Sequence, residues 1–338
     1  MSEIDLCRRC VLPSTFPGVA FDDGICNFCA QSPDADGLRA RRGDLAAAMR
    51  QIIEERRRSA EYDCVVAFSG GKDSTYTLMM LVRELDLRCL AVTIDNGFIS
   101  PQAMANCKAV TSALGVDLVV YAPSFGFMKN MYVESIRNEE LHPKAAIKRA
   151  SSICNSCINL INNHMLKTAV RYQIPMIAGG YVGGQVPKDA AILRIDLARQ
   201  RRQQEIVVQR KVAALGPDAA RHFDLGPDVA SGMTELVILN PMLTVAISEE
   251  AIIQAIAPLG WQRTLDTGLN SSNCRLNDLG ISLHHRKHRF HPYVFEISEQ
   301  IRSGAMTREA GLRKVGDIPS LSNLSGQLEK LQLNAASL

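Results

Sequence analysis

The chain has 338 residues, of which 46% are hydrophobic, and a formal net charge of +3. This length and composition indicate a globular protein with a packed core, built as one large domain or two moderate ones. No run approaches the roughly 18 apolar residues of a membrane span, and the N-terminus lacks the layout of a signal peptide, so we expect a cytoplasmic protein with no membrane partner. The small charge does not by itself argue for nucleic acid.

Four cysteines near the N-terminus form two CxxC pairs, Cys7 with Cys10 and Cys26 with Cys29. Four thiolates at this spacing can surround a tetrahedral metal ion, and zinc is strongly favoured. We therefore predict a structural zinc ribbon over residues 1–35. Four unconnected cysteines are the alternative interpretation.

The segments that follow differ from one another in their pattern of apolar and polar residues. Residues 36–60 are charged, with apolar side chains at helical spacing, and predict a linking helix. Residues 61–245 alternate short apolar strands with helices, which predicts an α/β domain with a mostly parallel sheet. Residues 246–338 have a helical pattern to the end.

A glycine-rich turn, SGGKDS at residues 69–74, lies between an apolar strand and a helix. The glycines let backbone amides face an anion, the helix N-terminus adds partial positive charge, and Lys72 adds a full one. The spacer of a Walker A loop is missing, so this is a different kind of diphosphate cradle. A glycine turn that merely starts a helix is the alternative.

This loop resembles the PP-loop of the ATP pyrophosphatase superfamily, whose members cleave ATP between the α and β phosphates and usually adenylate a substrate. The resemblance implies a Rossmann-like domain of the adenine nucleotide alpha-hydrolase type that binds ATP and Mg²⁺, with Lys72 and Asp73 as catalytic residues. Asp95, at the end of the second strand, lies where such enzymes place an acidic group, although a turn role is the alternative. The implied nucleotide contacts are Ala67, Ser69, Gly70, Gly71, Lys72, Asp73, Ser74, Asp95 and Gly179.

A further pair of cysteines, Cys154 and Cys157, lies three residues apart where Ser151 or Ser152 can cap a helix. Both thiols would share one face of the first turn, and the positive helix end should lower their pKa values. Such a pair of cysteines is suited to binding a metal or to thiol–disulfide redox chemistry. Two buried structural cysteines are the alternative.

The segment CNSCINLINNHMLKTAVRYQIPMIAGG is similar to one in the tRNA 2-thiolation enzymes, which carries CxxC, a helix and a strand ending in glycine. In those enzymes a third cysteine follows, and the three hold a [4Fe-4S] cluster. Cys274 corresponds to the third cysteine, after a segment with Asn240 where arginine is common. The resemblance implies that Cys154, Cys157 and Cys274 bind the cluster, with Cys274 also catalytic. The alternative is a Cys154–Cys157 redox pair with Cys274 remote.

This resemblance predicts an ATP-dependent sulfur transferase. The enzyme would adenylate a carbonyl oxygen of a small-molecule or tRNA acceptor, release pyrophosphate, and replace the oxygen by sulfur from a donor, through the iron–sulfur cluster.

A second resemblance supports an alternative function. The segment CVLPSTFPGVAFDDGICNFC resembles the leader before the PP-loop in amidotransferases that act on nucleotide-linked N-acetyl sugars. Gly179, Gly180 and Gln185 replace the Asn and acidic residues of the thiolation enzymes and are closer to the amidotransferase pattern. Ammonia would then come from a partner glutaminase. A regulatory nucleotide-binding module without turnover is a third hypothesis, and a homodimer is compatible with each.

Four histidines, His284, His285, His288 and His291, lie among arginine and lysine residues in LHHRKHRFHPYVFE. A solvated basic face is the simplest interpretation of this run. Binding of phosphates or a stacked base at the substrate end of the ATP site is the functional alternative, and zinc binding lacks a regular ligand spacing.

Overall fold

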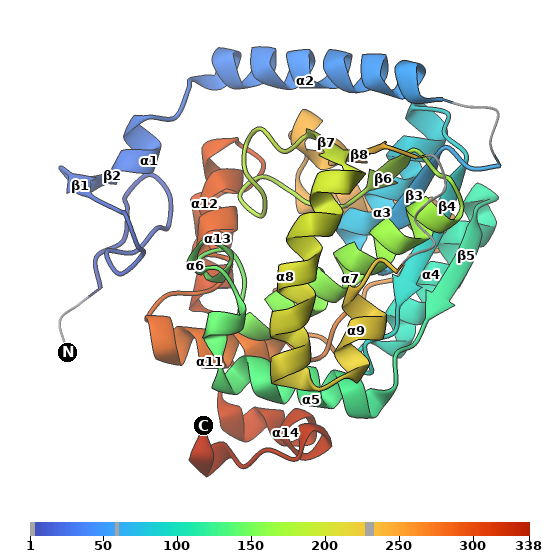
Figure 1. The fold of residues 1–338 in the computed structure, drawn as a ribbon. Helices are drawn as coiled ribbons and strands as arrows, with labels where there is room; N and C mark the ends of the chain where they lie inside the picture. The colour runs from blue at the N-terminus through green and yellow to red at the C-terminus, as the bar shows by residue number, and fades with distance from the viewer. Residues whose placement is uncertain (1–3, 58–60, 227–232) are drawn as a thin grey trace.

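A computed structural model describes residues 4–57, 61–226 and 233–338 (Figure 1). Its central sheet has the strand order β5-β4-β3-β6-β8-β7. Neighbouring strands are parallel, except that β7 is antiparallel to β8. The predicted mostly parallel α/β fold is therefore confirmed. The strands are β3 (Cys64–Ala67), β4 (Cys89–Ile94), β5 (Asp117–Tyr121), β6 (Met176–Ala178), β7 (Ile192–Asp196) and β8 (Glu235–Leu239).

The central strands are apolar on both sides because both faces of the sheet are covered. Successive side chains of a strand point to opposite faces, so Val65 and Leu90 enter one core while Val66 and Ala91 enter the other. The first core contains side chains of α5 (Phe125–Arg137) and α7 (Ser152–Arg171). The second contains side chains of α2 (Ala35–Arg56), α3 (Lys72–Met79) and α4 (Pro101–Leu114).

The remaining helices complete the chain. The predicted linking helix is α2, and residues 58–60 of that prediction lie outside the described residues. The π-helical turn Met80–Glu84 extends α3. The other α-helices are α6 (Lys144–Ile147), α8 (Leu197–Leu215), α9 (Asp218–Phe223), α10 (Glu249–Ile256), α11 (Asn277–His288), α12 (Val294–Arg302), α13 (Arg308–Gly316) and α14 (Ser325–Leu331). Short 3-10 segments are Glu139–Leu141, Pro241–Thr244, Ala257–Leu259, Leu321–Leu324 and Ala335–Ser337.

The elements of residues 61–245 that were not predicted from the sequence include α5, β7 and α8. The strand β7 lies at the edge of the sheet and alternates exposed with half-buried residues, so it lacks a continuous apolar run. The helix α8 has many polar residues, and its apolar side chains Ile206 and Val207 are 58% and 46% exposed. No helix in the described ranges has both the length and the apolar character needed to cross a membrane.

The N-terminal cysteine segment forms a small module that packs against the C-terminal helices (Figure 1). It contains the hairpin of β1 (Phe21–Asp22) with β2 (Ile25–Cys26) and the short helix α1 (Asn27–Ala30). The ring of Phe16 lies 5.2 Å from that of Phe290 and 5.4 Å from that of Phe295, centroid to centroid. An aromatic cluster thus joins the N-terminal module to residues 290–295.

Candidate functional site

A cavity of about 1690 Å³ lies at the carboxyl edge of the parallel strands. Its wall includes residues within two positions of the ends of β3, β4, β6 and β8, such as Ser69, Asn96, Gly179 and Asn240. Loops from neighbouring parallel strands gather at this edge, which is where open α/β sheets bind ligands. The cavity is therefore the candidate active site.

The phosphate loop forms part of this wall, and its backbone is held by distant segments. Gly70 has a φ of +69°, and a Cβ there would collide with the carbonyl oxygen of Ala103. The indole N–H of Trp261 donates to the Gly70 carbonyl oxygen at 2.9 Å. The amide of Lys72, the first residue of α3, donates to the hydroxyl of Ser272 at 3.1 Å. The loop is thus preorganised by packing.

Most of the predicted nucleotide contacts line the cavity. Lys72 places Nζ 2.8 Å from Asp73 Oδ2 and 3.9 Å from Glu249 Oε2. Burial lowers the pKa of Lys72, but the carboxylates of Asp73 and Glu249 outweigh this effect and hold that pKa above its ordinary value. Lys72 is therefore a charged group inside the cavity wall. The predicted contacts that line the cavity are Ala67, Ser69, Gly71, Lys72, Asp73, Ser74 and Gly179.

Asp95 lies outside this lining. Its carboxylate accepts a hydrogen bond from the backbone N–H of Gly97 at 3.0 Å, which is the turn role that the sequence left open. The next residue, Asn96, lines the cavity instead. The sequence analysis missed Asn96, although its position directly after β4 and its polar character were available signals.

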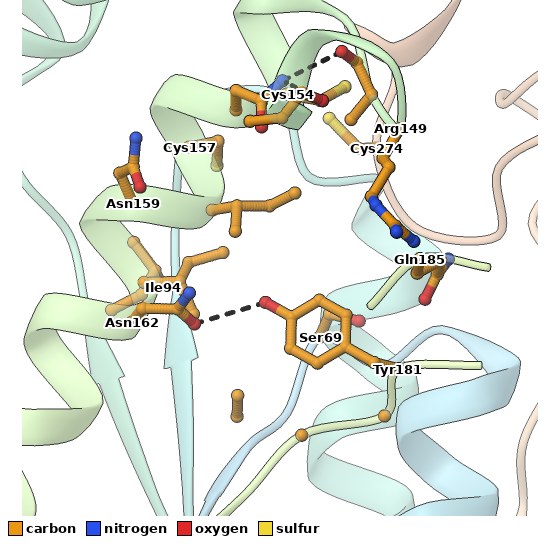
Figure 2. Close-up of a pocket in the computed structure, with 18 of the residues that line it drawn as sticks. Ser69, Ile94, Arg149, Cys154, Cys157, Asn159, Asn162, Tyr181, Gln185 and Cys274 are labelled. Atoms are coloured by element: carbon orange, nitrogen blue, oxygen red, sulfur yellow. Dashed lines mark hydrogen bonds between the residues drawn. The ribbon is translucent and has the colours of Figure 1, made fainter. Parts of the chain in front are cut away.

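The three cysteines that the sequence grouped together all line the cavity (Figure 2). Ser151 caps α7, because its hydroxyl accepts a hydrogen bond from the N–H of Cys154 at 3.2 Å. The side-chain amide of Asn96 donates to Cys157 Sγ at 3.7 Å and to Cys274 Sγ at 3.5 Å. All three cysteines are free thiols. Residues 120 positions apart in the chain therefore meet at one site.

The predicted lowering of the cysteine pKa values is wrong for Cys157. Burial raises the pKa of the Cys157 thiol, and burial also raises the pKa of Cys274 to about 12. The sequence argument considered only the positive helix end, whereas desolvation of the thiolate is the larger effect here. Their raised pKa values keep Cys157 and Cys274 protonated beside the amide donor that they share, and binding of a cationic metal group would ionise them.

One residue missed by the sequence analysis, Glu296, also lines the cavity. Glu296, on α12, accepts hydrogen bonds from the side-chain amides of Gln185 and Gln300, each at 3.0 Å. Burial raises the pKa of Glu296 to about 7. The carboxyl group is thus poised to exchange a proton near neutral pH, which is a property of acid–base groups in active sites. No sequence motif marks this residue.

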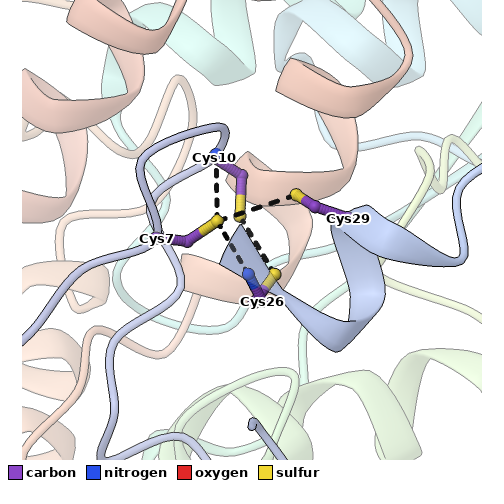
Figure 3. Close-up of side chains that lie close together, drawn as sticks. All are labelled: Cys7, Cys10, Cys26 and Cys29. Atoms are coloured by element: carbon purple, nitrogen blue, oxygen red, sulfur yellow. Dashed lines mark hydrogen bonds between the residues drawn. The ribbon is translucent and has the colours of Figure 1, made fainter. Parts of the chain in front are cut away.

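The N-terminal cysteines form a second, separate cluster (Figure 3). The sulfur atoms of Cys7, Cys10, Cys26 and Cys29 lie within 4.8 Å of one another and all four residues are buried. Nη1 of Arg302 donates to Cys10 Sγ at 3.6 Å. Four buried thiols close a tetrahedral coordination sphere, so this cluster suits a structural metal ion and leaves no position for a substrate.

The histidine run is divided between core and surface. His284 and His291 are buried, and burial lowers the pKa of each to about 3. His288 and Lys287 contact the carboxylate of Glu139 at 3.1 and 2.8 Å. The prediction of a solvated basic face is therefore wrong for His284 and His291, which pack inside the protein. Within the described ranges the run forms no group of metal ligands.

Comparisons with known proteins give distant similarities. No family model matches the chain. The uncharacterized protein MJ1599 of Methanocaldococcus jannaschii is 22% identical over 272 residues, which are 79% of each chain. Similar solved structures include an NH3-dependent NAD synthetase of Campylobacter jejuni in complex with a nitrate ion, with 11% identity, a TM-score of 0.35, and coverage of 65% of this chain and 74% of that one.

A second similar structure is the U34-tRNA thiolase NcsA of Methanococcus maripaludis with its [4Fe-4S] cluster. It has 13% identity and a TM-score of 0.38, with coverage of 93% of this chain and 89% of that one.

The N-terminal cluster generates a first prediction. Cys10→Ser should lower the content of bound zinc and loosen residues 4–30, because one ligand of a four-cysteine site is lost. Zinc analysis and hydrogen exchange would measure both effects, and nucleotide binding should persist. Cys154→Ser is the matched control and should leave the N-terminal segment protected. Stoichiometric zinc in a protein that lacks residues 1–30 would contradict the assignment.

The raised pKa of Glu296 generates a second prediction. Because the folded-state pKa of about 7 exceeds the ordinary value of 4.5, the stability from this group is complete below pH 4.5 and is lost as the pH rises through 7. The wild-type protein should therefore lose about 2–3 kcal/mol of unfolding free energy through this group between pH 5 and pH 8. The Glu296→Gln variant, which cannot ionise at this position, should not show that loss. Urea titrations across this range would test it, with Glu250→Gln as the exposed control. Parallel stability curves for wild type and Glu296→Gln would refute the prediction.

Proposed function

We propose that this protein is an ATP-dependent sulfur transferase. The observation that carries the proposal is that the phosphate loop and three free thiols line one cavity. ATP at the loop and a sulfur-binding group at the thiols would thus both reach an acceptor placed between them.

The chemistry divides into two steps. The carbonyl oxygen of the acceptor attacks the α-phosphorus of ATP, the bond between the α- and β-phosphates breaks, and pyrophosphate leaves. Lys72 and the loop amides stabilise the negative charge that develops on this leaving group. Hydrosulfide from a donor then attacks the activated carbon, and AMP leaves with the original oxygen.

Cys154, Cys157 and Cys274 would hold a [4Fe-4S] cluster, which supplies a binding place for the transferred sulfur. The donor set supports this assignment, because three thiols without a fourth protein ligand make a poor structural zinc site. Asn96 would orient two of the ligands through its side-chain amide. Glu296 is placed to take or return a proton during acceptor activation. Zinc at the N-terminal cluster and Mg²⁺ with ATP are part of the same proposal.

An amidotransferase is the second candidate, and the loop after β6 favours it. Gly179 and Gln185 line the cavity, and Gln185 contacts Glu296. Ammonia from a partner glutaminase would then replace hydrosulfide in the second step. One experiment separates the two candidates. The purified protein is supplied with ATP, candidate acceptors and either sulfide or ammonium, and the release of AMP and pyrophosphate and the mass of the product are measured. Nucleotide binding without AMP release under every condition would support the regulatory module.

The remaining features of the proposal come from the sequence. We propose a cytoplasmic location and a division into a ribbon (1–35), a linking helix (36–60), a catalytic domain (61–245) and a helical region (246–338). The acceptor, a small molecule or tRNA, and the sulfur donor complete the list of partners, and a homodimer is compatible with the fold.

The loop assignment generates a third prediction. Lys72→Ala should lower the rate of pyrophosphate release at least ten-fold, because it removes the charge directed at the leaving group. Lys108→Ala, at an exposed position of α4, is the matched control and should keep the wild-type rate. A wild-type rate in the Lys72 variant would show that the loop is not the catalytic cradle.

The thiol assignment generates a fourth prediction. After anaerobic purification, Cys274→Ser should retain far less iron and sulfide than wild type, because an oxygen ligand is a poor substitute for thiolate on iron. Cys89→Ala, at a buried position on β4 outside the cavity lining, is the control and should bind iron normally. Full activity in a wild-type sample without iron would exclude the cluster and favour amide or redox chemistry.

A further inference from the structure

A buried lysine lines the cavity without a hydrogen-bond partner among the described residues. Lys211, on α8, is 3% exposed, and its Nζ has no hydrogen-bond partner within the described part of the chain. The ring of Phe223 lies 5.6 Å from this nitrogen, measured to the centroid. An unpaired ammonium group is unfavourable to bury, whereas an anionic ligand would offset its desolvation.

The protein groups around Lys211 do not neutralise it. Burial first, and then the charge of Lys211, lowers the pKa of His142 to about 4, so the imidazole is neutral. Glu134 and Glu140 also line the cavity, but among the residues described neither forms an ion pair with Lys211. Burial lowers the pKa of Lys211 itself. Among the residues described, no carboxylate pairs with this ammonium group, so an anionic ligand in the cavity would supply the missing opposite charge.

Side-chain amides line the cavity along α7 and along α8, the helix that carries Lys211. They come from the facing positions of α7 and α8, and Gln204 donates a hydrogen bond to Asn163 across the two helices. The remaining oxygen of Gln204 is buried without a donor in the described structure. Amides both donate and accept, so this wall matches phosphate oxygens and hydroxyl groups. The amides that line the cavity here are Asn159, Asn162, Asn163, Gln200, Gln203 and Gln204.

We propose that Lys211 and this amide wall bind a phosphate group of the acceptor, which is a phosphorylated, hydroxyl-bearing small molecule. The proposal rests on the proposed function, since it places the acceptor in the same cavity as ATP. The volume of about 1690 Å³ exceeds the roughly 300–1,000 Å³ of a pocket for one small ligand, so both fit.

The burial of Lys211 also decides between a small molecule and RNA. Backbone phosphates of RNA are bound at the protein surface by exposed basic side chains. Lys211 is 3% exposed, so a phosphate must enter the cavity to reach it. A compact phosphorylated molecule can do this, whereas the backbone of a folded RNA stays outside.

Calorimetry on the full chain tests the proposal. The phosphate loop is first filled with α,β-methylene-ATP and Mg²⁺, and the protein is then titrated with inorganic phosphate and with uridine diphosphate. Lys211→Met should weaken binding of both probes at least ten-fold, Lys211→Arg should retain it, and Lys108→Met should match wild type. Both probes should raise the melting temperature of wild type but not of Lys211→Met. Without probes, Lys211→Met should be no less stable than wild type, which verifies its folding.

Equal binding of the probes by wild type and Lys211→Met would overturn the proposal. Binding of a single-stranded RNA that depends on Lys211, with no binding of either small probe, would overturn it in favour of RNA. The same titrations in Lys72→Ala without the ATP analogue separate this proposal from the proposed function. Binding that depends on Lys211 in a protein that never releases AMP would support the phosphate site and refute the enzymatic function.

Discussion

The close approach of three backbone segments around the phosphate loop is the constraint on which the site depends. Gly70 has no room for a Cβ beside the carbonyl of Ala103, and a Cβ on Gly180 would lie 2.9 Å from Cα of Ser74. The loop therefore sits between α4 and the segment after β6, with Trp261 hydrogen-bonded to its backbone. Because these contacts involve backbone atoms, the amides are oriented before any ligand arrives, which reduces the reorganisation that binding a pyrophosphate requires.

The aromatic cluster between the N-terminal module and α12 extends this constraint to Glu296 in the cavity wall. Phe295 stacks on Phe16 with an interplanar angle of 9°, and the next residue, Glu296, lines the cavity. Arg308 donates to the carbonyl oxygens of Cys7 and Cys10 at 3.2 and 3.0 Å. A metal ion that rigidifies the module would thus help to hold Glu296 in place, although the module contributes no residue to the cavity lining.

The sequence predicted those features that depend on local chemistry. The turn at residues 69–74, the cap at Ser151 and the four-cysteine cluster each follow from short-range patterns, and the structure places them as expected. The edge strand β7 and the polar helix α8 were missed, because exposed elements carry weak hydrophobic periodicity. Glu296 and Lys211 were missed for a different reason. Their properties arise from burial by segments that are distant in the chain, and no local pattern records that desolvation.

The distribution of charge on the cavity wall indicates how the adenylated intermediate of a two-step reaction would stay bound in the cavity. Near the phosphate loop, Lys72 and Lys314 contact the carboxylate of Glu249 at 3.9 and 2.9 Å, so positive charge there is already compensated. Compensated lysines bind the pyrophosphate product less tightly than free ones, which favours its departure. Lys211 has no such carboxylate in the described structure. On the proposed function, the acceptor phosphate would therefore stay bound while pyrophosphate leaves, and the adenylated carbon would remain in the cavity until its oxygen is replaced.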